Sequence, residues 1–181
     1  DGFTYRFVPI KNKTNLSERG FTDTDELYRK MTSLYTWDTL KRTDWFVDYQ
    51  NLYTFCGVMS QRGIFASVAM EMIKAGEYDM AVEILDKCQS VIPEENFPLD
   101  IIMYGLSNER DLICIIEAYY LAGEYEKASS LCSSMSDEIL ASCGFFLRHY
   151  EYAKDYFDSC YNLLGVLAAI AHEYGDTDLA S

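Results

Sequence analysis

The side chains that could carry out chemistry are few in this chain and far apart. The two histidines, His149 and His172, have no cysteine or carboxylate near them at the spacing of a zinc site. The sequence has no glycine-rich phosphate loop and no Gly-x-Ser-x-Gly string. Its aspartates and glutamates gather at predicted helix starts and turns, and no isolated pair lies on an apolar face. These patterns predict no catalytic residue, no metal site and no cofactor.

The six cysteines show none of the spacings that indicate a redox or metal motif. No Cys-x-x-Cys is present, and most of the cysteines stand at apolar positions of predicted helices, where a thiol behaves as a small hydrophobic group. Pairing between neighbouring helices stays open for a domain in an oxidising compartment. The six are Cys56, Cys88, Cys114, Cys132, Cys143 and Cys160.

Composition limits the partners of the chain. The 181 residues carry a formal net charge of -14, so the average surface repels phosphate backbones and anionic lipid headgroups. No run approaches the ~18 consecutive apolar residues of a membrane helix. We therefore expect no nucleic-acid partner and no direct membrane insertion by this segment, whereas a hydrophobic content of 49% is enough for a buried core.

A repeated phrase indicates how the chain is organised. Residues Ala75–Ala81, Ala-Gly-Glu-Tyr-Asp-Met-Ala, are nearly repeated by Ala122–Ala128, Ala-Gly-Glu-Tyr-Glu-Lys-Ala. In each copy a small or aliphatic helical pattern precedes the glycine, and a second helical pattern follows it. The stretches Phe65–Pro93 and Leu112–Met135 therefore predict two helical hairpins with turns at Gly76 and Gly123.

Helical periodicity covers most of the remaining chain. Trp37 and Trp45 flank a polar link and are expected to act as lids on the core. Leu164, Leu167 and Ala168 keep the offsets of the first helix of a repeat, which makes about two and a half units. The helices predicted from these patterns span Thr24–Tyr35, Tyr49–Ala75, Tyr78–Ser90, Asp137–Leu147 and Tyr150–Tyr174, and the second hairpin spans Asp111–Met135. Tyr49–Ala75 is one long helix or two helices with a break near Gly63.

The predicted fold class is therefore all-α, a tetratricopeptide-like helical-hairpin solenoid with a short N-terminal extended segment. Phe3–Ile10 alternates apolar and polar residues until Pro9 interrupts the pattern, as an extended or edge segment does. We expect residues 1–20 to continue from an upstream region and residues 21–181 to form a single helical-repeat domain.

The first helices of the units of such a solenoid would line its concave groove. Apolar side chains and both charges occur there, and the inserted segment Glu94–Asn108 or the last helix could instead fill it. The candidate groove residues are Met70, Ile73, Lys74, Arg110, Glu117, Tyr120, Asn162, His172 and Glu173.

Several stretches together resemble the C-terminal region of a bacterial family of large multi-pass membrane proteins of unknown function, related to eukaryotic transmembrane O-mannosyltransferases. They are the opening Asp1–Ile10, the helix start Asp23–Asp25 leading to Trp37, the turn Ala75–Gly76, and the Leu85–Cys88 and Val91–Pro93 stretches. The resemblance implies a membrane-embedded, glycosyltransferase-like portion upstream that holds the catalytic carboxylates. It also implies that this segment lies on the extracytoplasmic, periplasmic face of the inner membrane.

These observations predict a non-catalytic protein-interaction domain that docks a protein or peptide partner beside a membrane-anchored glycosyltransferase-like protein. The partners expected are that protein or peptide and the rest of the membrane-embedded chain. Two alternatives stay open: a purely structural cap of the membrane enzyme, and an independent enzyme.

Overall fold

The computed structural model describes residues 23–42, 44, 58–99, 108–176 and 179, and all regular structure in these ranges is helical. The prediction of an all-α fold built from helical hairpins is therefore confirmed. The predicted extended segment 1–20, Trp45 and the first part of the helix predicted from Tyr49 lie outside the described residues.

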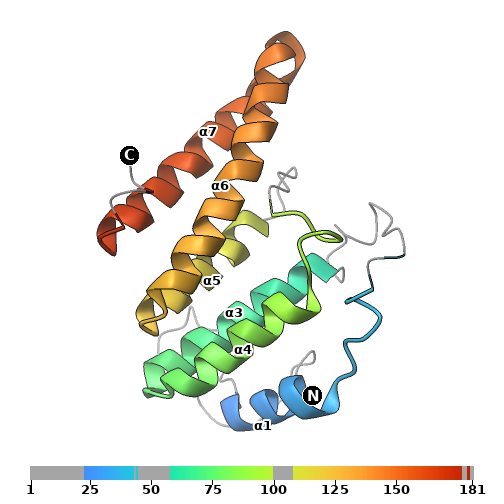
Figure 1. Ribbon diagram of the computed structural model, residues 1–181, viewed down its shortest axis with the longest axis vertical. Helices are drawn as coiled ribbons and strands as arrows, with labels where there is room; N and C mark the ends of the chain where they lie inside the picture. Colours follow the sequence, from blue (N-terminus) through green and yellow to red (C-terminus); the bar gives the residue numbers. More distant parts are fainter. Residues whose placement is uncertain (1–22, 43, 45–57, 100–107, 177–178, 180–181) are drawn as a thin grey trace, which may run out of the picture.

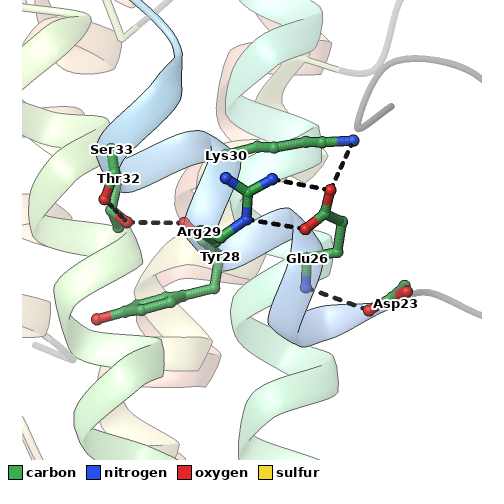
Figure 2. A network of polar contacts seen from close by, with 7 residues as sticks. All are labelled: Asp23, Glu26, Tyr28, Arg29, Lys30, Thr32 and Ser33. Atoms are coloured by element: carbon green, nitrogen blue, oxygen red, sulfur yellow. Dashed lines mark hydrogen bonds and ion pairs between the residues drawn. The ribbon is translucent and has the colours of Figure 1, made fainter.

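The N-terminal helix α1 (Thr24–Arg29) begins at a side-chain cap, because Asp23 Oδ1 accepts a hydrogen bond from the Glu26 backbone N–H at 3.1 Å. The Glu26 carboxylate pairs with two cations, as Figure 2 shows. Its Oε2 lies 2.9 Å from Nε of Arg29, and its Oε1 lies 3.2 Å from Nζ of Lys30. These hydrogen bonds lower the pKa of the Glu26 carboxyl to about 2. The chain continues as the π-helical turn η1 (Lys30–Leu34), so the helix expected over Thr24–Tyr35 is confirmed to within one residue.

Trp37 closes one end of the core, as predicted. Its side chain is buried, its indole Nε1 donates to the Met31 carbonyl at 3.0 Å, and its ring centroid lies 5.3 Å from that of Phe65. The buried indole N–H thus has the partner that burial of a tryptophan requires.

The first hairpin consists of α3 (Val58–Ala75) and α4 (Tyr78–Val91). Gly76 has a φ of 83°, a left-handed conformation that suits glycine, and the Glu77 N–H returns to the Met72 carbonyl at 2.9 Å. Ala69 and Ala81 are fully buried, which lets the two helices approach closely. The expected turn and both helices of this unit are confirmed.

The second hairpin repeats this geometry with α5 (Asn108–Leu121) and α6 (Tyr125–Arg148), joined at Gly123, whose φ is 86°. Helix α5 packs along α3. The approach is close at Gly63, where an added Cβ would meet the Asp111 carboxylate at 2.6 Å. The two units are therefore stacked through their first helices, as in a helical solenoid.

The helix predicted to start anew at Asp137 does not exist, since α6 continues without interruption from Tyr125 to Arg148. Asp137 and Glu138 resemble a helix start, but no glycine or proline precedes them. Met135 and Ile139 are both fully buried, so one face packs across the expected break. Burial of this face therefore outweighs the helix-start signal of Asp137 and Glu138.

The last helix, α7 (Tyr150–Glu173), ends before Gly175, whose φ is 81°, as predicted. It packs along α6 and makes only slight contact with α5, although the repeat pattern makes it the counterpart of α3 and α5. Figure 1 shows the result: α6 and α7 form a long hairpin whose connecting end extends away from α3 and α4. The packing of first helices that joins α3 to α5 therefore does not continue from α5 to α7.

A buried arginine ties the segment that follows α4 to the first hairpin. Arg62 is 1% exposed and donates to the carbonyls of Phe97 at 2.6 Å, Pro98 at 3.3 Å and Ile92 at 3.4 Å. Phe97 itself is fully buried. Phe97 and Leu99 therefore anchor the described part of the insertion in the core.

The described cysteines agree with the prediction of small buried hydrophobic groups. Cys88, Cys132 and Cys160 are buried, and Cys114 and Cys143 are partly buried. Burial raises the pKa of the Cys88 thiol to about 12.

Candidate functional site

The structure brings only some of the predicted groove residues together. Tyr120 is buried, its ring stacks on that of Tyr174 with centroids 4.6 Å apart, and its hydroxyl donates to Asp176 Oδ2 at 3.3 Å. The ring of Tyr125 meets Tyr120 edge-on at 5.9 Å. Tyr174 and Asp176, which follow α7 directly, therefore cover Tyr120.

Glu117 and Glu173 lie near this tyrosine cluster. Burial raises the pKa of the Glu117 carboxyl, and the charge of Glu173 raises it further. Burial and the same two carboxylates raise the pKa of the Tyr174 hydroxyl. The α5–α7 contact therefore collects negative charge beside tyrosine rings.

The remaining predicted groove residues are spread over other surfaces. Met70 and Ile73 are partly buried against the core, and Lys74 is exposed and pairs with Glu71 at 2.6 Å. Asn162 and His172 are exposed on α7. Arg110 lies in α5, and its side chain is outside the described residues.

A different cleft lies between α4 and α6, with Tyr119 of α5 among its lining residues. We call it the α4–α6 groove; its volume is about 640 Å³. None of the predicted groove residues lines it. It is lined by Asp86, Gln89, Ser90, Glu94, Tyr119, Glu126, Lys127, Ser130, Leu131 and Ser134.

A polar triad crosses this groove from three helices. Asp86 of α4 accepts the hydroxyl of Tyr119 at 3.0 Å and Nζ of Lys127 at 3.0 and 2.8 Å. Burial, followed by the Asp86 charge, raises the pKa of the Tyr119 hydroxyl, so this group stays a neutral donor. The Lys127–Asp86 pair is about half exposed and can open at little cost.

Gln89 lines the groove and holds an unused hydrogen-bond donor beneath its surface. Its Nε2 is buried and has no hydrogen-bond partner among the residues that the structure describes. Glu94 is a further polar group there, and its carboxyl pKa is raised by burial and by Glu138. An unpartnered buried amide costs free energy that a ligand acceptor would recover.

The groove is lined mainly by polar side chains. Its hydroxyls, amide and carboxylates surround one half-exposed lysine, and neither histidine lies among its lining residues. Within the described residues, no group of three or more histidine, cysteine, aspartate or glutamate side chains is placed to hold a metal ion. No described helix is long and apolar enough to cross a membrane.

Sequence reasoning missed the α4–α6 groove because it looked only at the first helix of each unit. A signal was present: Ser130 and Ser134 are one turn apart on α6, on a helix whose other face carries the buried Cys132 and Met135. Polar residues at such spacing also describe an ordinary solvated face, so the pattern alone does not distinguish a groove.

Comparison with known protein families, curated proteins and solved structures finds no match for this chain. The resemblance to the membrane-protein family stays a prediction.

Proposed function

We propose that this chain is a non-catalytic docking domain whose α4–α6 groove binds an extended segment of a partner protein. We further propose, from the sequence resemblance, that it belongs to a larger membrane-anchored, glycosyltransferase-like protein on the extracytoplasmic face of the inner membrane.

The unpartnered amide of Gln89 in the groove is the observation that carries the docking proposal. An extended peptide presents one carbonyl and one N–H per residue, so it could donate to Ser130 or Ser134 and accept from Gln89 after a rotation of the Gln89 side chain exposes its amide. Leu131, which is 7% exposed, adds an apolar contact in the same groove.

Charge favours a basic segment as the ligand. Asp86, Glu94 and Glu126 line the groove against the single cation Lys127, in a chain of net charge -14. A lysine or arginine of the partner could replace Lys127 on Asp86 with little loss, because exposed ion pairs contribute only ~0–1 kcal/mol. Long-range attraction would also speed association with a basic partner.

A selection experiment tests this function. The purified chain is used to select binders from a displayed library of random linear peptides, and the affinity of each enriched peptide is measured by fluorescence anisotropy. We expect enrichment of peptides with a lysine or arginine, and about a tenfold or greater weakening of binding by Gln89→Ala or Asp86→Asn.

A matched control separates the groove from the rest of the surface. Ser159→Ala removes an exposed hydroxyl of α7, far from the groove residues in sequence, and should leave the affinity unchanged. If no peptide is enriched, or if the enriched peptides bind both groove variants as tightly as the wild type, docking in this groove is wrong. The structural cap would then be the better interpretation.

A further inference from the structure

A buried hydroxyl fixes the carboxylate of Asp86 in the α4–α6 groove. The Tyr119 hydroxyl donates to Asp86 Oδ1 at 3.0 Å, and Tyr119 is only 2% exposed, so the core sets the position of this donor. The Asp86 side chain is itself 47% exposed and lines the groove. The carboxylate is therefore anchored from one side and accessible to a ligand from the other.

An ammonium group already occupies this position. Nζ of Lys127 lies 3.0 and 2.8 Å from the two carboxylate oxygens of Asp86, and 5.9 Å from the centroid of the Tyr119 ring. A carboxylate and the face of an aromatic ring are both favourable partners for a lysine ammonium. We call the position between Asp86 and the Tyr119 ring the lysine subsite.

Lys127 has a second partner to which it can withdraw. Oε2 of Glu124, three residues earlier, lies 3.5 Å from Nζ of Lys127. The Lys127 side chain is 41% exposed, so its ion pair with Asp86 contributes little and can open without burying a charge. Lys127 can therefore leave Asp86 and stay paired with Glu124.

The hairpin does not require a cation at this position. Met80 and Lys127 each follow the turn glycine of their unit, Gly76 or Gly123, by four residues. Met80 is partly buried against the core, so an apolar side chain of similar length serves the same position in the first unit. The charge of Lys127 is thus dispensable for packing the hairpin.

We infer that Lys127 is a built-in competitor for the lysine subsite, and that a lysine of the partner segment displaces it onto Glu124. This inference rests on the docking function proposed above, and it adds the residue that the groove recognises and the residue that limits its affinity. Because one exposed ion pair is exchanged for another, Lys127 weakens binding without preventing it.

Titration of the full chain with the peptide acetyl-Ala-Ala-Lys-Ala-Ala-amide, followed by NMR chemical shifts of groove residues, tests this inference. Lys127→Met copies the residue of the first hairpin and should bind the peptide about two- to fivefold more tightly than the wild type, because the competitor is gone. The same peptide with norleucine in place of lysine should not bind. Circular dichroism checks that each variant is folded.

Lys154→Met is the matched control. It removes the same charge from an exposed side chain of α7 that does not line the groove, so any effect of net charge alone is equal in both variants. Its affinity should equal that of the wild type. In an Asp86→Asn background the gain from Lys127→Met should vanish, since the two cations then have no carboxylate to compete for.

Each other result overturns the inference. Equal or weaker binding by Lys127→Met means that Lys127 does not compete, and an equal gain from Lys154→Met means that net charge alone is responsible. A gain that persists in the Asp86→Asn background places the competition elsewhere, and a peptide that binds neither the wild type nor Lys127→Met removes the lysine subsite. Groove docking is judged separately, since it stands if peptides from the displayed library still respond to Gln89→Ala.

Discussion

Helices α3 and α7 occupy equivalent places in the repeat, yet the fold treats them differently. Helix α3 packs on both α4 and α5, and Phe65, Ala69 and Met72 are fully buried. Helix α7 packs along α6 alone for most of its length and leaves Tyr161 and Val166 exposed. The same sequence period therefore gives a core helix where neighbours lie on two sides and a surface helix where one side is open.

This difference shows that repeat position sets which residues can be buried, while the neighbours decide which of them are. Val68 and Leu167 stand at the same distance before their turn glycines, and each is 1% exposed. Ala66 and Gly165 are equivalent too, but only Ala66 is buried. One stripe of α7 is thus core, and the neighbouring stripe is exposed.

The largest expected effect comes from truncating equivalent core positions. Phe65→Ala should lower the free energy of unfolding by about 3–5 kcal/mol, because Phe65 is fully buried against Trp37. Leu164 stands at the equivalent position of α7 and is only partly buried. Leu164→Ala should therefore lower the free energy of unfolding by less than about 2 kcal/mol. Urea unfolding followed by circular dichroism measures both, and equal losses would contradict the contrast between the two helices.

Removing the buried arginine should have the next largest effect. Arg62→Met keeps the apolar bulk but leaves the carbonyls of Ile92, Phe97 and Pro98 without this donor, which should cost about 2–3 kcal/mol. Arg148→Met is the control, since Arg148 is exposed at the end of α6 and its loss should cost less than about 0.5 kcal/mol. Chemical denaturation distinguishes the two, and an unchanged midpoint for Arg62→Met would show that the three carbonyls find other partners.

Two glycines of the second hairpin should respond with opposite signs. Gly123→Ala should destabilise by about 1–2 kcal/mol, because its φ is 86°. Gly144→Ala should stabilise by about 0.5–1 kcal/mol, since Gly144 lies inside α6 and an added Cβ meets nothing within 4 Å. Thermal unfolding of both variants checks the signs, and destabilisation by Gly144→Ala would mean that the projecting end of α6 is packed more tightly than described.

The smallest predicted effect depends on pH. Burial and Glu173 raise the pKa of Glu117 in the folded chain, so its protonated form is favoured there, and its contribution to stability is lost as the pH rises through that pKa. Glu117→Gln should therefore stabilise by a few tenths of a kcal/mol at neutral pH and by nothing below the ordinary carboxyl pKa of 4.5.

The wild type is the reference for this titration, since it differs from Glu117→Gln only at this carboxyl. Unfolding midpoints measured across the acidic and neutral range would show a pH-dependent gap between Glu117→Gln and the wild type. A gap that widens on acidification would contradict the assigned direction of the Glu117 pKa.

The groove prediction illustrates how far sequence reasoning reached. Glu117, Tyr120 and Glu173 do lie in one region, because they follow from the phase of the repeat. Tyr174 stacks on Tyr120 only because α7 runs back along α6 toward α5. The residues near Tyr120 do not encode the direction of α7. The α4–α6 groove arises between two helices distant in sequence, so its lining residues could not be recognised one helix at a time.

By itself, the sequence determined the helices, the turns and the core stripes. Helical hydrogen bonds join residues four apart, and Gly76, Gly123 and Gly175 adopt positive φ for local steric reasons, so a short window holds the necessary information. Only the tertiary structure decided that α6 runs unbroken past Asp137, that α7 follows α6 instead of α5, and that Tyr161 and Val166 are exposed. These outcomes depend on burial against distant neighbours, which outweighs a local cap or turn signal when the two disagree.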